Sequence, residues 1–157
     1  MPMTPQEMLA VATETVREAF VGVFTTVDVQ GMPHSRCMGA AAEEHGLQDL
    51  YTLTGKHTRK LENLRKNPAV AWVFSVNDYE RVVTLKGTAE ILEAPVMAQK
   101  AWDRLAEAAR AYSMNALSDE ANLEFVVIHT HVTYLDLLYP SRGLVRPEPI
   151  ELGPASP

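Results

Sequence analysis

Residues 21–36 read VGVFTTVDVQGMPHSR, and this stretch decides the fold. Its first part, Val23 to Val27, is rich in β-branched and aromatic side chains, which favour a strand. Residues 28–31 predict a turn, because Gly31 can adopt a positive φ there. A connection this short returns the chain antiparallel, so we expect the next strand, Met32 to Ala42, to pair with the first.

The same kinds of pattern extend in both directions from this hairpin. Upstream, Thr4 and Glu7 have the spacing of a capping box, which predicts a helix that begins there and is ended by Gly22. Downstream, residues 69–76 are continuously apolar, and we expect a strand buried on both faces. Gly87 interrupts a later strand and predicts a bulge or a close backbone approach. The remaining predicted elements are strands at 48–54, 81–92 and 125–138, and helices at 58–66 and from Pro95 to Tyr112.

The order of these elements indicates the fold class. Several of the six strands are joined by connections of hairpin length, which predicts an antiparallel sheet. Six strands in an open sheet would leave exposed edges, so closure into a small barrel is favoured. We therefore predict a mainly β (α+β) barrel domain with flanking helices over residues 1–140, followed by a proline-rich C-terminal tail over residues 141–157.

Composition narrows the classes of function. The 157 residues suit one domain, and their formal net charge of -6 argues against nucleic acid and anionic membranes as partners. No basic leader followed by an apolar segment is present, and no apolar run approaches the ~20 residues of a membrane span. The single cysteine, Cys37, can form neither a disulfide within the chain nor a thiolate metal cluster. We expect a cytoplasmic protein.

A basic turn contrasts with this acidic background. Residues 54–60, TGKHTRK, place hydroxyls and cations around a glycine at a predicted helix start. Such groups, together with the unpaired N–H groups of a helix N-terminus, suit a phosphate monoester. The alternative is a solvated helix face, since Glu62 and Lys66 form an ordinary i,i+4 pair. Arg36 either contacts the same phosphate in bidentate fashion or faces solvent at the barrel rim.

Five segments, taken in order along the chain, give a more specific pattern. They are Val21–Arg36, Leu50–Thr52, Thr58–Lys60, Asn67–Ala71 and Val82–Ala89. On these segments the chain resembles the pyridoxamine 5'-phosphate oxidase-like flavoproteins, and its length is most similar to their general stress protein branch. The resemblance covers about residues 5–138 and implies an antiparallel six-stranded split β-barrel with flanking helices.

The resemblance also implies an FMN cofactor. In the family, an arginine of the second strand, an aromatic-threonine pair of the third strand and a Ser/Thr-Arg-Lys segment at the short helix hold FMN. Backbone groups after the arginine lie along the edge of the isoalloxazine ring. The family assembles as a homodimer with flavin bound between protomers. The corresponding side chains here are Arg36, Tyr51, Thr52, Thr58, Arg59 and Lys60, and the backbone groups are those of Cys37, Met38 and Gly39.

The activity implied by the resemblance is flavin redox chemistry. A reduced nicotinamide would donate hydride, which would pass to a small-molecule substrate or to oxygen. Oxidation of vitamin B6 itself is not expected, because Val82 replaces a flavin-contacting glutamine and residues 139–146 lack the family's substrate motif. The sequence offers no convincing general acid or base. The alternatives are a deazaflavin-dependent reductase on the same fold and a non-catalytic module that binds flavin or haem for storage or sensing.

Several further residues have chemistry that the flavin hypothesis does not use. His129 and His131 alternate on one predicted strand and share a face. Two imidazoles could bind a metal, but no third ligand is evident, so we favour a position at the barrel rim or dimer face and predict no metal site. His34 either lines a substrate pocket or lies at the surface of the turn. Cys37, adjacent to Arg36, is either a redox thiol or a buried and inert cysteine, and we favour the second. Trp72 is expected to lie in the core or an interface.

Overall fold

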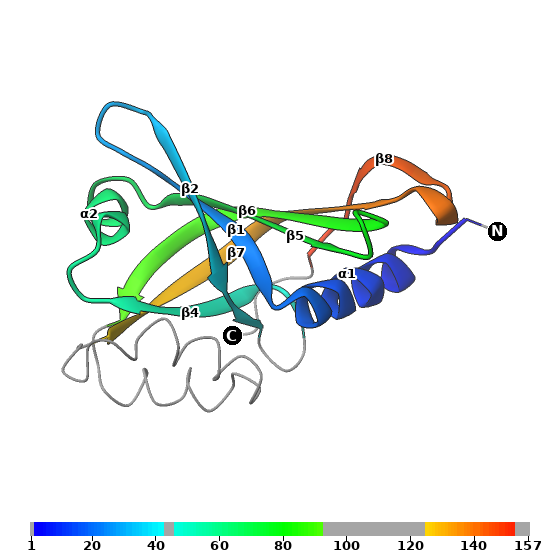
Figure 1. The fold of residues 1–157 in the computed structure, drawn as a ribbon. Coiled ribbons are helices and arrows are strands. Elements are labelled where there is room, and N and C mark those ends of the chain that lie inside the picture. Colours follow the sequence, from blue (N-terminus) through cyan, green and yellow to red (C-terminus); the bar gives the residue numbers. More distant parts are fainter. Residues whose placement is uncertain (1, 43–45, 93–124, 153–157) are drawn as a thin grey trace.

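The computed structural model describes residues 2–42, 46–92 and 125–152, which form a curved sheet with α2 at one end and α1 toward the other (Figure 1). The predicted helix from Pro95 to Tyr112 lies outside these residues. In chain order the elements are α1 (Pro5–Ala19), β1 (Val21–Val27), β2 (Pro33–Gly39), β3 (Ala41–Ala42), β4 (Asp49–Gly55), α2 (Arg59–Lys66), β5 (Ala69–Val76), β6 (Arg81–Leu92), β7 (Phe125–Tyr139), the 3-10 turn η1 (Pro140–Arg142) and β8 (Leu144–Pro149).

Helix α1 begins at the predicted capping box. The Thr4 hydroxyl accepts a hydrogen bond from the Glu7 backbone N–H at 3.1 Å, and the Thr4 N–H donates to the Glu7 carboxylate at 2.7 Å. These two bonds satisfy N–H groups that a helix start leaves without intrahelical partners. The helix ends at Ala19, before the predicted Gly22, because Phe20 adopts a positive φ of 58°. Gly22 instead lies within β1.

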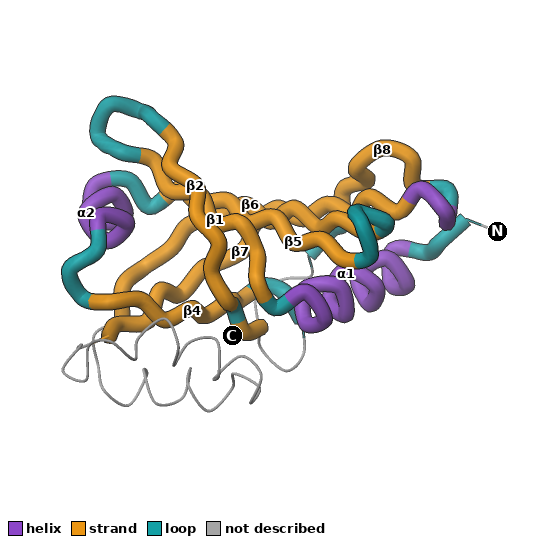
Figure 2. Tube along the Cα trace, in the orientation of Figure 1, coloured by secondary structure: helices purple, strands orange, loops and turns teal. Residues whose placement is uncertain are grey.

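The sheet curls so that its two ends meet. Its hydrogen-bonded strand order is β2-β1-β5-β6-β7-β4-β3, and neighbouring strands are antiparallel. Figure 2 shows the strands of this sheet in orange and helices α1 and α2 in purple. Only Ala40 separates β2 from β3, so the first and last strands of this order are one continuous piece of chain. The predicted antiparallel split barrel is confirmed. The predicted count of six strands is wrong, partly because the single strand expected at 32–42 divides at Ala40 to pair with two different neighbours.

The other additional strand, β8, arises within the segment predicted as a tail. It pairs with β7, and just beyond it the Ile150 N–H donates to the Leu135 carbonyl at 2.8 Å. Pro147 and Pro149 are compatible with this strand because it pairs on one side only, and an edge strand can lack N–H donors on its free side. The proline-rich segment, predicted as a tail, therefore contains an edge strand, and the sheet continues beyond residue 140.

The core lies on the concave face of the sheet and is built around aromatic side chains. Trp72 is fully buried, with ring centroids 4.4 Å from Phe24 and 5.4 Å from Phe74. Strand β5 alternates, however, so the prediction that residues 69–76 are buried on both faces is wrong: Val73 is 38% exposed. The reason is that an antiparallel sheet of this kind has one face on the core and one face turned away from it.

Gly87 marks an irregularity between β6 and β7, as predicted. The strand register shifts between Lys86 and Gly87, and a Cβ at Gly87 would collide with the His131 carbonyl oxygen. The bulge also changes which residues of β7 face the core: Val132 faces inward, and the next inward residue is Leu135, three positions later instead of two.

Among the described residues, no helix is long and apolar enough to cross a bilayer.

Candidate functional site

The structure brings Arg36 of β2 close to the start of α2. Arg36 lies opposite Phe24 in the β1–β2 register, and its side chain crosses to the inner face. Its Nη1 donates to the Thr26 hydroxyl at 2.9 Å and to the Phe24 carbonyl at 3.4 Å. The guanidinium carbon lies 5.9 Å from the centre of the Phe24 ring. Arg36 is therefore a partly buried cation held against β1 by hydroxyl, carbonyl and aromatic groups.

Lys60, in the first turn of α2, faces the same region. Its Nζ donates to the Thr54 hydroxyl at 2.9 Å, and the Thr54 and Thr58 hydroxyls are 3.4 Å apart. Thr58 is the N-cap residue of α2, but its side chain makes no capping hydrogen bond to the helix backbone. The first turn of α2 thus presents backbone N–H groups beside two hydroxyls and an ammonium group. We call Thr26, Arg36, Thr54, Thr58 and Lys60 the cationic cluster.

The electrostatics of the cationic cluster favour an anion. Burial lowers the pKa of the Arg36 guanidinium. Burial also lowers the pKa of the Lys60 ammonium, and the positive charge of Arg36 lowers it further. Within the described parts of the chain, neither cation forms an ion pair with a carboxylate. Two partly desolvated positive charges that repel each other lower their free energy when a phosphate binds between them.

Two residues that complete this region were missed by the sequence hypothesis. Thr26 is fully buried and accepts hydrogen bonds from both Arg36 Nη1 and, at 3.1 Å, Asn63 Nδ2. Asn63 is itself buried on the inner face of α2, beside Leu64. An amide among the inward leucines of a short amphipathic helix was the available signal. The bond from Asn63 fixes α2 against β1 and so fixes Lys60 relative to Arg36.

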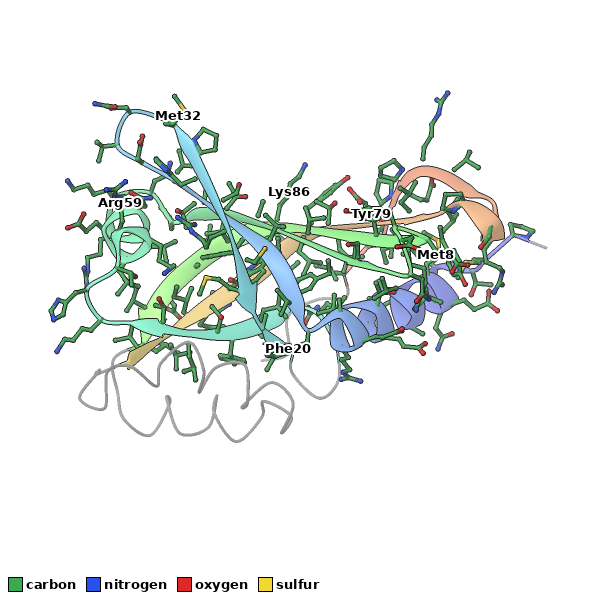
Figure 3. The ribbon with its side chains drawn as sticks, in the orientation of Figure 1. Met8, Phe20, Met32, Arg59, Tyr79 and Lys86 are labelled. Carbon is green, nitrogen blue, oxygen red and sulfur yellow. The ribbon has the colours of Figure 1, made fainter. Side chains whose placement is uncertain are left out.

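The other predicted contacts lie in different surroundings. Thr52 is buried and its hydroxyl donates to the Gly39 carbonyl, which joins β4 to the end of β2. Arg59 is exposed at the start of α2 (Figure 3). Tyr51 is on the opposite face of β4 from Thr52, with its ring 4.6 Å from the His129 ring. The structure therefore groups Arg36, Thr58 and Lys60 together and places Tyr51 apart from them.

Cys37 and His34 also have defined positions. Cys37 is exposed, which corrects the prediction of a buried thiol: the alternation of β2 that turns Arg36 inward turns its neighbour outward. His34 Nε2 lies 2.9 Å from the carboxylate of Asp28 in the β1–β2 turn. Hydrogen bonds from His34 and from the Met32 N–H lower the pKa of Asp28. His34 was expected either to line a substrate pocket or to lie at the surface of the turn, and its contact with Asp28 places it beside the turn.

A second group of titratable side chains lies across β4, β7 and β6. Asp49 lies opposite His131 in the β4–β7 register, and Glu90 lies opposite His129 in the β6–β7 register. All four side chains lie on the face of the sheet that carries Tyr51, which is the face opposite to Thr52 and Thr54. The sequence indicated only the two histidines, because Asp49 and Glu90 are distant from them along the chain. We call these four residues the histidine cluster.

Comparison with known proteins now identifies the family. The family model described as pyridoxamine 5'-phosphate oxidase matches residues 8–138, which is most of the chain. The chain belongs to the pyridoxamine 5'-phosphate oxidase family. That range contains the cationic cluster and the histidine cluster, and it confirms the resemblance expected from the sequence. No curated protein matches the chain.

Solved structures with the same fold include two proteins named for general stress protein 26. The chain is similar to a protein from Clostridium acetobutylicum related to general stress protein 26, with a TM-score of 0.72, 18% identity, and coverage of 96% of this chain and 97% of that one. It is also similar to general stress protein 26 from Bacillus anthracis (TM-score 0.63, 21% identity, 89% and 98% coverage). An F420 reductase is similar as well (TM-score 0.56, 23% identity, 78% and 93% coverage). These likenesses show a shared fold.

Proposed function

We propose that the protein binds FMN and acts as a flavin-dependent oxidoreductase on a small molecule. The observation that carries this proposal is the cationic cluster, in which Arg36 and Lys60 converge from separate elements without a carboxylate partner among the described residues. A phosphate monoester fits this donor set, since its oxygens accept from a guanidinium, an ammonium, hydroxyls and helix N–H groups. All the proposed contacts fall within residues 1–140, the predicted flavin-binding domain.

The proposal uses the predicted residues other than Tyr51. Arg36, Thr58 and Lys60 bind the phosphate, and Arg59, exposed at the start of α2, lies in position to approach it from solvent. Backbone groups of Cys37, Met38 and Gly39 line the ring, and Thr52 fixes this backbone through its bond to the Gly39 carbonyl. Tyr51 lies on the other face of β4, away from the cationic cluster. FMN, when bound, supplies transfer of a hydride or of single electrons between a nicotinamide and an acceptor.

The proposal includes a homodimer with flavin at the interface. An exposed apolar row supports it: Val23 is 40% exposed, Val73 is 38% exposed, and the two are direct partners across β1 and β5. Cys37 is the partner of Val23 on the other side, so the row reaches the backbone proposed to line the ring. Adjacent exposed valines on a sheet face are expected where a second subunit packs. Two protomers would desolvate a cofactor of this size better than one.

Vitamin B6 oxidation is not part of the proposal. Val82, at the position of the family's flavin-contacting glutamine, is an apolar side chain on β6 and cannot donate a hydrogen bond to the flavin. Residues 139–146, which lack the family's substrate motif, form the end of β7, the turn η1 and the start of β8. A deazaflavin is the second candidate cofactor, favoured by the shared fold with an F420 reductase, and its phosphate groups would use the same cationic cluster.

Two measurements test the proposal. The absorbance spectrum and mass of the compound that co-purifies with the protein distinguish FMN from a deazaflavin, whose absorbance lies at shorter wavelength, and from haem. A fluorescence titration of cofactor-free protein with FMN is expected to saturate, and the bound flavin is expected to be reduced by a nicotinamide donor. Binding without reduction would indicate the non-catalytic module. Absence of saturation by FMN would overturn the proposal.

A further inference from the structure

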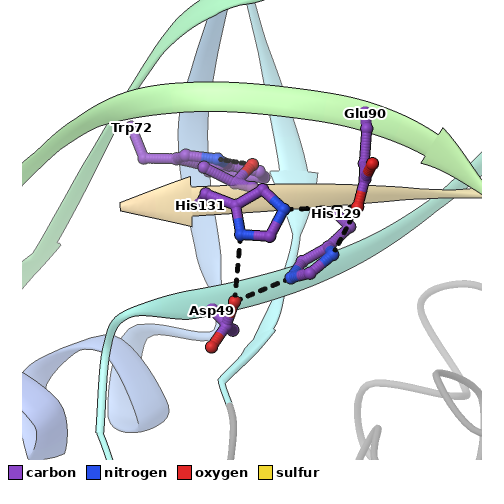
Figure 4. Close-up of polar contacts among 6 residues, drawn as sticks. Asp49, Trp72, Glu90, His129 and His131 are labelled. Carbon is purple, nitrogen blue, oxygen red and sulfur yellow. Dashed lines mark hydrogen bonds and ion pairs between the residues drawn. The ribbon is translucent and has the colours of Figure 1, made fainter. Parts of the chain in front are cut away.

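The histidine cluster joins three adjacent strands through its side chains (Figure 4). His129 Nε2 is 2.8 Å from Asp49 Oδ1, and His131 Nδ1 is 3.3 Å from the same oxygen. On the other side, His129 Nδ1 and His131 Nε2 are each 3.2 Å from Glu90 Oε1. The two rings lie side by side, with centroids 4.0 Å apart. Every imidazole nitrogen of the cluster therefore faces a carboxylate oxygen.

A count of protons shows that two neutral histidines cannot satisfy this arrangement. Each neutral imidazole carries one N–H, so the two rings supply two donors for four contacts between imidazole nitrogens and carboxylate oxygens. If Glu90 accepts from His129 Nδ1–H and His131 Nε2–H, the remaining lone pairs of both rings face Asp49 Oδ1. Lone pairs on three atoms directed at one place repel each other unless a positive charge lies between them.

We propose that Asp49, His129 and His131 bind one divalent transition-metal ion, and that Glu90 positions the two rings. The three ligand atoms all lie within 4.8 Å of one another, and the two distances to Asp49 Oδ1 are 2.8 and 3.3 Å. Ligands about 2.0 Å from a tetrahedral Zn²⁺ ion are about 3.3 Å apart. The distance between His131 Nδ1 and Asp49 Oδ1 matches this spacing, and the distance of 2.8 Å between His129 Nε2 and Asp49 Oδ1 would lengthen on binding. Two imidazole nitrogens and one carboxylate oxygen suit Zn²⁺, with a fourth position left for water.

Glu90 completes the arrangement as a positioning residue. A carboxylate that accepts the distal N–H of a metal-binding histidine fixes the tautomer and the ring orientation. Here one oxygen of Glu90 does so for both rings, and this leaves His129 Nε2 and His131 Nδ1 free for the ion. The His131 side chain is 49% exposed and that of Glu90 is 54% exposed, so an ion can reach the site from solvent. The buried side of the site is His129, which is 12% exposed.

The site is separate from the cationic cluster and does not depend on the flavin proposal. Alternation along β4 places Asp49 on the opposite face from Thr52 and Thr54. The backbone also fixes the geometry locally, since the bulge at Gly87 brings β6 close to the His131 carbonyl. Bound metal would join β4, β6 and β7 and stabilise the fold by the free energy of its binding.

Zn²⁺ binding to the full chain tests the inference. The protein, with any affinity tag removed, is titrated with ZnCl₂ by calorimetry and by competition with a chromogenic chelator. We expect one ion per chain and a rise in the melting temperature with Zn²⁺. His131→Ala and Asp49→Asn should abolish both effects, and Glu90→Gln should weaken affinity by about 10- to 100-fold. His34→Ala is the matched control, because this histidine of β2 also pairs with a carboxylate, that of Asp28, but lies outside the histidine cluster.

Exposed His131 is preferred to His129 for the test, because its replacement leaves the contact of His129 with Tyr51 intact. Circular dichroism of each variant without metal shows whether it folds, and a variant that fails is replaced by His131→Gln. Three results would overturn the inference: no saturation of the wild-type protein by Zn²⁺, equal affinity of His131→Ala and the wild type, or NMR spectra in which both imidazoles are doubly protonated at neutral pH and unchanged by Zn²⁺.

Discussion

Replacing Lys60 by methionine should separate recognition of the phosphate from recognition of the flavin ring. Methionine keeps most of the aliphatic stem and removes the ammonium group that donates to Thr54 at 2.9 Å. The ammonium is partly desolvated beside Arg36, as the direction of its pKa shift indicates. A hydrogen bond to a charged group in such a setting contributes about 1.5–3 kcal/mol. Loss of one such bond to phosphate should therefore weaken FMN binding by about 10- to 140-fold.

The assay compares two ligands that differ only in the phosphate. Dissociation constants for FMN and for riboflavin are measured by quenching of flavin fluorescence with wild-type protein, Lys60→Met and Arg36→Met. Both variants should lose affinity for FMN and keep the wild-type affinity for riboflavin. Lys66→Met is the matched control, because Lys66 is exposed at the far end of the same eight-residue helix, and it should leave both constants unchanged.

The double variant examines whether the two cations act on one group. Arg36 and Lys60 would contact the same phosphate, so the loss in the double variant should be smaller than the sum of the single losses. If Lys60→Met weakened FMN and riboflavin equally, the phosphate assignment would be wrong. If Lys60→Met changed the dissociation constants for FMN and riboflavin no more than Lys66→Met does, the cationic cluster would not be part of the flavin site.

Three further predictions concern stability, measured as the free energy of unfolding in urea. Thr4→Ala should lower it by about 1 kcal/mol through loss of the capping box, whereas Thr4→Ser should restore it. Gly87→Ala should lower it by about 1–3 kcal/mol, because the new Cβ meets the His131 carbonyl, and an unchanged value would contradict the bulge geometry. The pKa of Lys60 in the folded protein lies below its ordinary value of 10.5. Between these two pKa values the unfolded chain binds more protons than the folded chain, so the free energy of unfolding of the wild type should rise with pH in this range. Lys60→Met should lack this rise.

Much of the fold followed from short-range patterns. The spacing of Thr4 and Glu7 predicted the helix start, and the turn before Met32 predicted the first hairpin, because each pattern acts over a few residues. Gly87 predicted a close backbone approach for the same reason, since only a residue without Cβ fits there. The order of the strands favoured a barrel, and the basic turn with Arg36 supplied the phosphate candidates; the resemblance carried by five segments added the split form of the barrel and FMN.

The failures concern features that depend on which strands become neighbours. Proline content suggested a tail, but β7 offers an edge that residues 144–149 can join. The apolar run 69–76 suggested burial on both faces, but its outer face is turned away from the core and leaves Val73 partly exposed. Cys37 was expected to be buried, and the pairing of β2 with β1 turned it outward.

The sequence by itself determined the helix start, the hairpins and the residue types available for binding phosphate, because these depend on backbone preferences and side-chain chemistry within a few positions. Only the tertiary structure decided that Arg36 meets Lys60, and that Asp49 and Glu90 enclose His129 and His131. Such contacts depend on strand order and register in a sheet that closes at Ala40. A shift of one residue in β2 would turn Arg36 to the other face, and a shift of one residue in β4 or β6 would do the same to Asp49 or Glu90.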